Sequence, residues 1–144
     1  MVILIDRREK TPWKFSETTK PATLLSGDYT IEGHESKIIV ERKGCVAEFA
    51  ANLKQKRFEA ELVRLEVVPY SFVVCEFTLD ELFSFPYGAG LGLSIIRRIK
   101  SRGPYLIKRL NELHMTYKTR FIFAGKKGRD FTLSLFKRYL ECTK

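Results

Sequence analysis

The stretch GDYTIEGHESKIIVERKG, residues 27–44, contains the pattern that decides the fold. Its first half is rich in β-forming residues between two glycines, and its second half runs from apolar residues into the charged triplet ERK. Two such runs joined by a short polar segment predict a hairpin that turns across residues 33–36. The hairpin would bring Asp28 beside Glu41 at one rim of the sheet.

Side chains alternate between the two faces along a strand. Glu41 and Lys43 therefore share one face with Ile39, and Arg42 points to the other face. We expect Arg42 to pair with a carboxylate under a flanking helix and to brace the strand. The triplet is then either the edge of an active site or a solvated strand end.

Further carboxylates gather near the same rim. VILID, residues 2–6, predicts a buried strand that ends in Asp6, and Glu9 follows three residues later. Clustered carboxylates repel one another, and a hard cation such as Mg²⁺ relieves that repulsion. A bound metal activates water and stabilises charge on a phosphoryl group, while a nearby lysine orients the water or stabilises the developing charge. The spacing Asp-x12-Glu-x-Lys is therefore typical of metal-dependent phosphodiester cleavage.

The rest of the chain predicts helices that alternate with strands. The expected elements are a loop over 10–26, a helix over 49–65, a strand over 70–77, helices over 79–85, 93–103 and 104–114, a strand over 119–125 and a helix over 130–143. The order β, β, β, α, β, α, α, α, β, α predicts an α/β fold, a mixed central sheet flanked by helices. A chain of 144 residues is expected to form a single domain, 1–144.

The composition of the chain indicates the class of binding partner and the kind of cellular compartment. The net charge of +9 favours a polyanion, and nucleic acid above others. Three cysteines at long spacings do not suggest a disulfide framework and fit a reducing compartment. The chain shows neither a membrane span nor a secretion signal, so we expect an intracellular protein with no membrane partner, in cytoplasm, nucleoid, infected-cell cytoplasm or nucleus.

The sequence resembles a known nuclease family. The elements D-x-R-E at residues 6–9, GD at 27–28 and ERK at 41–43 occur in this order. Together they are similar to the GD-x(n)-ERK-x3-D signature of the XPF-type structure-specific nuclease domain, and the resemblance covers nearly the whole chain. It implies a restriction-endonuclease-like fold in a stand-alone form, without the tandem helix-hairpin-helix domain of cellular members.

The resemblance also implies roles for individual residues. Asp6, Asp28 and Glu41 correspond to the acidic metal-site residues, and Lys43 to the catalytic lysine. The supporting residues are Arg8, Glu9 and Arg42. Glu9 and Arg42 are counted with the expected catalytic residues, together with Asp6, Asp28, Glu41 and Lys43. Arg8 is counted with the expected DNA contacts.

The chain departs from the signature at its last acidic position. The final Asp of the pattern falls on Ala47, and Glu48 lies one position late. Either Glu48 substitutes after a one-residue shift, or this carboxylate is absent. Glu48 also stands near a helix start, where an acid is favoured in any case.

Basic clusters mark the expected DNA contacts, because phosphates are bound by clustered Lys and Arg. The first candidate group follows the ERK strand most closely and consists of Lys54, Lys56 and Arg57. The second group follows the glycine-rich loop and consists of Arg97, Arg98, Lys100 and Arg102. We interpret a third group, Lys126, Lys127 and Arg129, as a solvated surface.

The C-terminal helix has apolar residues on more than one face, whereas packing on one core normally needs a single stripe. These residues are Phe131, Leu133, Leu135, Phe136, Tyr139 and Leu140. We therefore expect a homodimer through this helix.

The leading hypothesis is a Mg²⁺- or Mn²⁺-dependent DNA endonuclease that prefers flapped, forked, nicked or branched DNA, as the resemblance implies. The alternative is a non-catalytic DNA-binding subunit.

Overall fold

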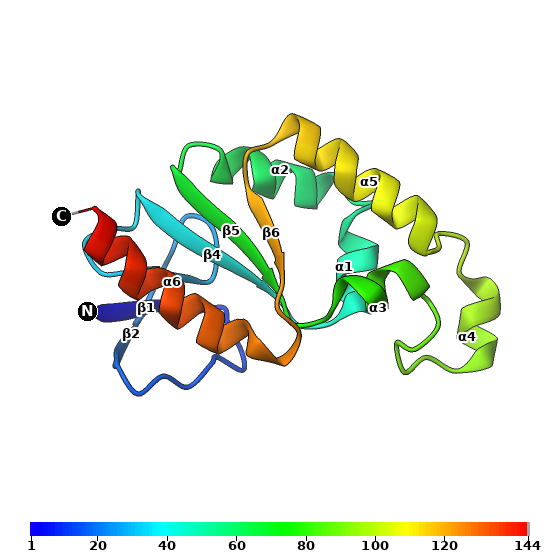
Figure 1. Cartoon of the computed structure of the whole chain (residues 1–144), viewed down its shortest axis with the longest axis horizontal. Helices are drawn as coiled ribbons and strands as arrows, with labels where there is room; N and C mark the ends of the chain where they lie inside the picture. Colours follow the sequence, from blue (N-terminus) through cyan, green and yellow to red (C-terminus); the bar gives the residue numbers. More distant parts are fainter. Residues whose placement is uncertain (144) are drawn as a thin grey trace.

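In the computed structural model, which describes residues 1–143, six strands form one mixed sheet (Figure 1). Their order is β2-β1-β3-β4-β5-β6. β1 pairs in parallel with β2 and antiparallel with β3, β3 and β4 are antiparallel, and β4, β5 and β6 run parallel. The strands are β1 (Val2–Asp6), β2 (Thr18–Ala22), β3 (Tyr29–Ile31), β4 (Ile38–Lys43), β5 (Tyr70–Cys75) and β6 (Arg120–Phe123). The predicted mixed α/β architecture is confirmed.

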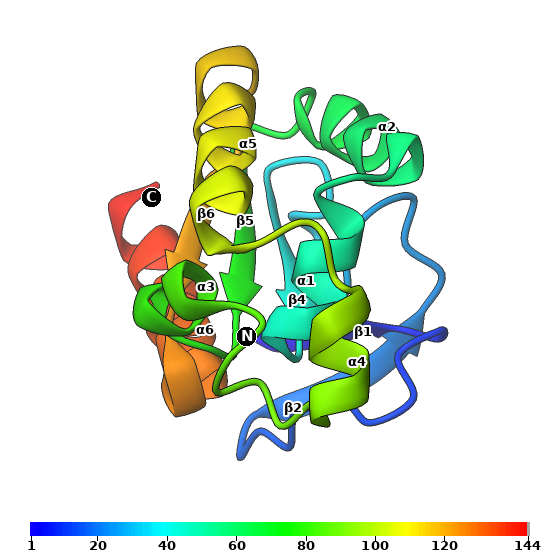
Figure 2. The same ribbon diagram turned by 90° about the vertical axis from the view of Figure 1, so that its right-hand side faces the viewer.

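Helices cover both faces of this sheet (Figure 2). α1, α2, α3 and α5 pack on one face, and α6 packs on the other. The helices are α1 (Val46–Asn52), α2 (Lys56–Leu65), α3 (Leu79–Ser84), α4 (Leu93–Arg98), α5 (Gly103–Thr116) and α6 (Gly128–Cys142), with a 3-10 turn η1 (Gly125–Lys127) before the last. Over residues 1–143, none of the helices combines the length and apolar character that crossing a membrane requires.

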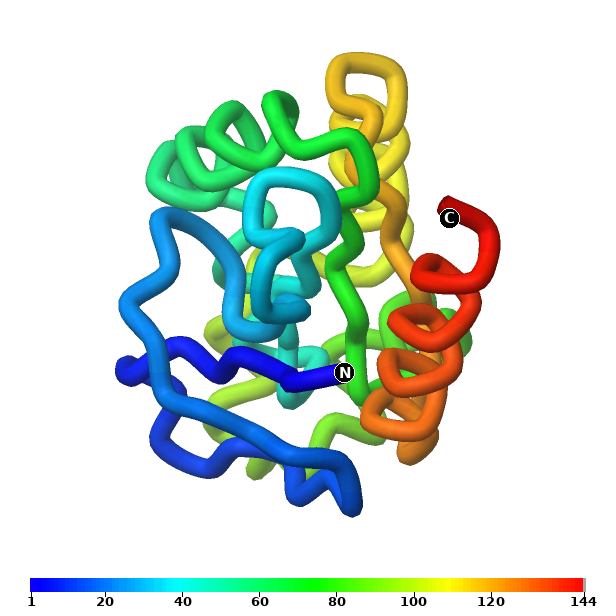
Figure 3. Tube along the Cα trace, turned by 90° about the vertical axis from the view of Figure 1, so that its left-hand side faces the viewer, coloured from blue at the N-terminus to red at the C-terminus, as the bar shows by residue number. Residues whose placement is uncertain are grey.

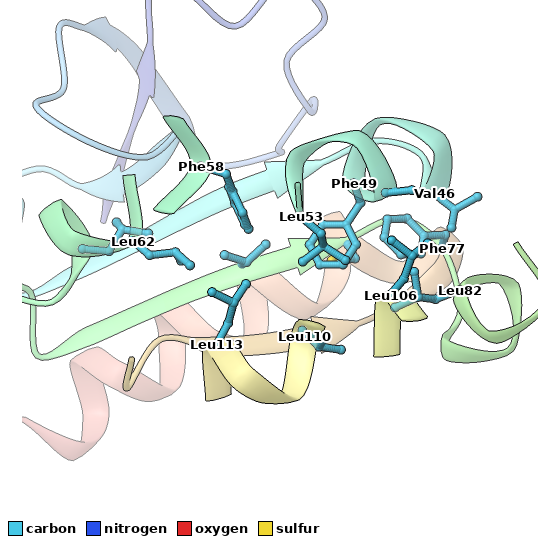
Figure 4. Close-up of a cluster of buried hydrophobic side chains, with 14 of the residues drawn as sticks. Val46, Phe49, Leu53, Phe58, Leu62, Phe77, Leu82, Leu106, Leu110 and Leu113 are labelled. Carbon is cyan, nitrogen blue, oxygen red and sulfur yellow. The ribbon is translucent and has the colours of Figure 1, made fainter. Parts of the chain in front are cut away.

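The larger core lies under α1, α2 and α5 (Figure 4). Phe49, Leu62 and Leu106 are fully buried there, and each such side chain contributes about 1.5–3 kcal/mol relative to an exposed position. The rings of Phe49 and Phe58 meet edge to face at 6.0 Å between centroids. This packing holds α1 and α2 against the face of β4 that carries Ile39.

The smaller core lies under α6. Trp13 stacks on Tyr29 at 4.7 Å between ring centroids, and Phe136 of α6 is fully buried beside them. Ile38 and Val40 belong to this core, whereas Ile39 belongs to the larger one. The alternation predicted for β4 is therefore confirmed.

The other apolar residues of α6 stay half-buried against the same core. They are Phe131, Leu133, Leu135, Tyr139 and Leu140. The core of one chain thus accepts a broader apolar stripe than the sequence pattern suggested, because the sheet and the segment around Phe15 flank the helix. The homodimer through α6 stays a prediction.

The structure corrects the loop expected over 10–26 and the long helix expected over 49–65. The loop expected over 10–26 contains β2, whose Pro21 is tolerated because β2 is an edge strand of the sheet. The helix expected over 49–65 is two helices, since α1 is capped at Leu53 and α2 starts after an extended Gln55. The break lets Phe49 and Phe58 point into one core.

The helix expected over 93–103 is also shorter, because Ile99 is extended and α4 ends at Arg98. α4 lies in an excursion of the chain between α3 and α5 (Figure 1). The two ends of this excursion meet, since the amide of Gly103 donates to the carbonyl of Phe85 at 2.9 Å. A Cβ on Gly103 would lie 1.8 Å from the carbonyl oxygen of Phe83, so only glycine fits at this contact.

Candidate active site

The register of the sheet brings three predicted carboxylates into one row. Tyr29 of β3 pairs with the penultimate residue of β1 and with Val40 of β4. Continuing the register by one residue places Asp6, Asp28 and Glu41 opposite one another. The amide of Asp6 donates to the carbonyl of Asp28 at 2.9 Å, which supports this alignment. Residues opposite one another share a face, here the face under α1 and α2.

The row borders a cavity of about 250 Å³ whose opposite wall is α2. The loop before β3 runs beneath α2 (Figure 3), and its residues 25–28 line the cavity. Arg57, Glu61 and Arg64 line the cavity at helical spacings of four and three residues. The full lining is Asp6, Arg8, Glu9, Leu25, Ser26, Gly27, Asp28, Glu41, Arg57, Glu61 and Arg64.

Sequence reasoning missed Glu61 and Arg64. Their approach to β4 depends on how α2 packs, which sequence order does not reveal. The spacing of Arg57, Glu61 and Arg64 on one polar stripe of α2 was the available signal.

Glu41 is the most strongly perturbed carboxyl group of the site. It is 9% exposed, and burial raises its pKa well above the ordinary value. Glu61, within hydrogen-bonding reach of Glu41, and Asp28 raise the pKa further because both are negatively charged when ionised. The structure therefore gathers negative charge around a buried carboxylate.

Asp28 and Asp6 are anchored differently. One oxygen of Asp28 accepts the amide of Arg42 at 2.7 Å. Both oxygens of Asp6 are engaged, by the Arg8 side chain at 2.8 and 3.3 Å and by the amide of Leu24 at 2.9 Å. Burial alone would raise the pKa of Asp6, but these hydrogen bonds outweigh it and lower the pKa. Asp6 thus fixes the loop before β3, and its predicted metal contact stays a prediction.

Glu9 lines the cavity and also lies near Arg42, whose side chain is on the opposite face of β4. Burial raises the pKa of Glu9, and the charge of Asp28 raises it further, while Arg42 at 3.8 Å opposes both effects. The supporting role of Glu9 stays a prediction.

Arg42 points to the opposite face of β4, as predicted. Its guanidinium donates to Glu76 at 2.5 Å and to the carbonyl of Thr11 at 2.6 Å, and it lies over the ring of Trp13 at 4.7 Å. Glu76 directly follows β5 and packs against the first turn of α6, where a Cβ on Gly128 would approach its side chain to 3.2 Å. Arg42 therefore joins β4 to the segment that supports α6.

Lys43 shares the face of Glu41 but is not part of the cavity lining. It is 6% exposed, and its Nζ lies 5.1 Å from the ring centroid of Phe58. The lysine lies between β4 and the start of α2. Its predicted contact with the substrate stays a prediction.

The structure places both residues at the position that departs from the signature. Ala47 packs against the larger core, and Glu48 is exposed and is not part of the cavity lining. Glu61 of α2 instead supplies a further carboxylate beside Glu41. The substitution of Glu48 for the final acid of the signature stays a prediction.

The structure brings two of the predicted DNA contacts, Arg8 and Arg57, to the cavity. Lys54 and Lys56 are exposed at the break between α1 and α2. Arg97, Arg98 and Lys100 are exposed on and after α4, outside the cavity lining. The cationic surface is thus divided between the site and the α4 excursion.

The residues present fit a hard divalent cation. Within residues 1–143, no three His, Cys, Asp or Glu side chains converge closely enough to hold an ion as they stand. Mg²⁺, however, is commonly bound by one or two carboxylates and keeps several waters. Asp28 and Glu41 offer that donor set, with carboxylate repulsion that a cation would relieve.

No protein-family model matches the sequence, and no curated protein is significantly similar to it. The solved structure of XPF from Aeropyrum pernix is similar to this chain, with a TM-score of 0.68 at 22% identity over 96% of this chain and 61% of that one. XPF from Aeropyrum pernix in complex with DNA gives the same TM-score and identity over 99% of this chain and 66% of that one. The chain spans less than two thirds of either. It therefore has the fold of an XPF-type nuclease domain.

Proposed function

We propose that the protein is a metal-dependent endonuclease that hydrolyses phosphodiester bonds of DNA. The observation that supports this proposal is the cavity in which Asp28, Glu41 and Glu61 gather negative charge beside Arg57 and Arg64. Carboxylates suit a metal ion, and arginines suit phosphate oxygens. The XPF-type fold and the net charge of +9 agree with a DNA substrate.

Asp28 and Glu41 would hold Mg²⁺ or Mn²⁺, with Glu61 beside them. When bound, the ion supplies an activated water and stabilises charge on the phosphoryl group. Arg57 and Arg64 orient the phosphate from the α2 side, and Asp6 keeps the loop before β3 in place through Leu24. Lys43 is the candidate for stabilising charge that develops at the phosphate.

We also propose branched, flapped, forked or nicked DNA as the substrate and a homodimer through α6 as the assembly. The half-buried apolar stripe of α6 supports the second proposal. Light scattering over a concentration series tests it, and a monomer throughout would contradict it.

One observation favours the alternative of a non-catalytic DNA-binding subunit. The Nζ of Lys43 lies over Phe58 rather than in the cavity. In that case the carboxylates would have no chemical role, and DNA binding by the arginines would remain.

The deciding experiment incubates the protein with labelled flap, fork, Holliday-junction, nicked and plain duplex DNA in Mg²⁺, Mn²⁺ or EDTA. Asp28→Asn and Lys43→Ala are tested in parallel, and Asn keeps the oxygen that accepts the Arg42 amide. Glu32→Gln is the matched control, since Glu32 is an exposed carboxylate paired with Lys20. We expect cutting that needs metal and is lost in both site variants. Binding of branched DNA without any metal-dependent cutting would support the alternative.

A further inference from the structure

A second and larger cavity lies beside the candidate active site. Its volume is about 600 Å³, and it is bounded by the loop before β3, the turn before β4 and the end of α2. Its walls are mainly apolar, with Leu24, Ile39 and Val68 buried at its base. The two cavities share a wall made of Leu25, Ser26 and Arg64.

The mouth of this second cavity carries unusually exposed apolar side chains. Leu25 is 98% exposed and Val67 is 82% exposed, so neither is covered by any other part of residues 1–143. Leaving such apolar surface in water is unfavourable. A ligand with an apolar face would gain this free energy on entering.

The shared wall indicates what that ligand is. A DNA strand whose phosphate lies at Asp28 and Glu41 must place the adjoining base on one side of it. Arg64 stands at the boundary of the two cavities and suits the phosphate between them. The apolar walls suit the flat face of a base, and the hydroxyls of Ser26 and Ser36 and the carboxylate of Glu35 suit its polar edge.

We propose that the second cavity receives one unpaired nucleobase, from the nucleotide next to the phosphate bound in the first cavity. This inference rests on the proposed function and deepens it. Extruding a base from a duplex costs the free energy of unpairing and unstacking, and an already unpaired base avoids most of that cost. The cavity therefore selects strands with an unpaired nucleotide beside the scissile bond, which gives a physical basis for a preference for flaps and branches.

The test compares Val67→Asp with Val63→Asp. Both valines are exposed, Val63 at 56%, so neither change opens the core, and only Val67 lines the second cavity. The probes are two flap oligonucleotides that differ at the unpaired nucleotide beside the junction, which is 2-aminopurine in one and an abasic residue in the other. Binding is measured by fluorescence anisotropy in EDTA, so that it does not depend on cleavage.

We expect the wild-type protein and Val63→Asp to bind the 2-aminopurine flap about tenfold more tightly than the abasic flap. Val67→Asp should bind both flaps equally and weakly, with an unchanged circular dichroism spectrum. Leu25→Ser, a milder change on the rim, should reduce the preference in part.

Two results would overturn the proposal. One is equal binding of both flaps by the wild-type protein, and the other is an unchanged preference in Val67→Asp. If Val67→Asp instead converted a dimer to a monomer and kept the preference, a second copy would occupy the cavity. Failure of cleavage in Mg²⁺ with the binding preference intact would overturn the proposed enzyme activity but leave the base cavity standing.

Discussion

The two faces of β4 treat charge in opposite ways. On the α6 side, Arg42 is surrounded by Glu76, Glu9 and the ring of Trp13, so its charge is balanced. On the α2 side, Glu41 is buried and the charges that act on it most strongly, those of Glu61 and Asp28, are negative as well.

Adjacent residues of one strand thus experience opposite environments. Removing one partner of a balanced buried pair is strongly destabilising, because the other charge is left buried and unpaired. A cluster of carboxylates destabilises the free protein, because the negative charges repel one another. We expect such a cluster where a cation binds to it. We therefore propose that Arg42 belongs to the scaffold and that Glu41 takes part in the chemistry.

The largest effect is expected for Glu41→Gln, which should separate activity from stability. The variant keeps the shape of the side chain and removes its charge, so metal-dependent cleavage should fall by about 1,000-fold. Its thermal stability without metal should equal or exceed that of the wild-type protein, since repulsion is removed. Single-turnover rates and calorimetry check this, and a large loss of stability would place Glu41 in the scaffold.

Arg42→Ala should do the reverse. The change leaves Glu76 and Glu9 without their cation, and we expect the free energy of unfolding to fall by about 3 kcal/mol. Arg129→Ala is the matched control, because its pair with Asp130 is exposed and should contribute less than about 1 kcal/mol. Urea denaturation measures both, and equal effects would remove the contrast between the two faces.

The pH dependence of stability should reveal the unbalanced face directly. The pKa of Glu41 is raised in the folded protein, so the folded state binds its proton more tightly than the unfolded state. The associated stability is present below the ordinary value of 4.5 and is lost as pH rises through the raised pKa. Without metal, unfolding free energy should therefore fall with pH above about 4.5 in the wild-type protein more steeply than in Glu41→Gln.

Addition of Mg²⁺ at pH 8 should raise the melting temperature of the wild-type protein and leave Glu41→Gln nearly unchanged, because the ion replaces the missing proton as a partner of the cluster. Parallel slopes in the two proteins, with no response to Mg²⁺ in either, would contradict the assignment of this charge surplus to Glu41.

The smallest effect is expected for Glu48→Gln, compared with Glu61→Gln. Glu48 is exposed and is not part of the cavity lining, so its change should alter the cleavage rate by less than about twofold. Glu61 lies beside Glu41, and its change should lower the rate by about tenfold or more. The reverse order would restore Glu48 as the substitute for the acid of the signature.

The sequence was sufficient to predict the geometry of β4, the strand that carries Glu41 and Lys43 of the candidate site. Alternation alone separated Arg42 from Glu41, and the hairpin spacing placed Asp28 opposite Glu41. Both inferences depend on local geometry with a fixed period, which neighbouring residues determine.

What the sequence missed depends on tertiary packing. Glu61 reaches the site because Phe58 and Leu62 bind α2 to the larger core, and that orientation is a property of the whole fold. Pro21 argued for a loop, yet it lies in an edge strand, where a missing amide does little harm. Lys43 was placed on the correct face, but the contact of its amine with Phe58 follows from the position of α2.

The hydrogen bond between Gly103 and Phe85 affects which insertions and deletions the fold can accept during evolution. Because the two ends of the α4 excursion touch, a segment of different length or charge can be spliced in between them without pulling on α3 or α5. Arg97 and Arg98 lie in this excursion, so they can be replaced without a change in the positions of α3 and α5. The carboxylate row on the sheet would be untouched by such an exchange, so the exposed surface of α4 and the candidate site can change independently of each other.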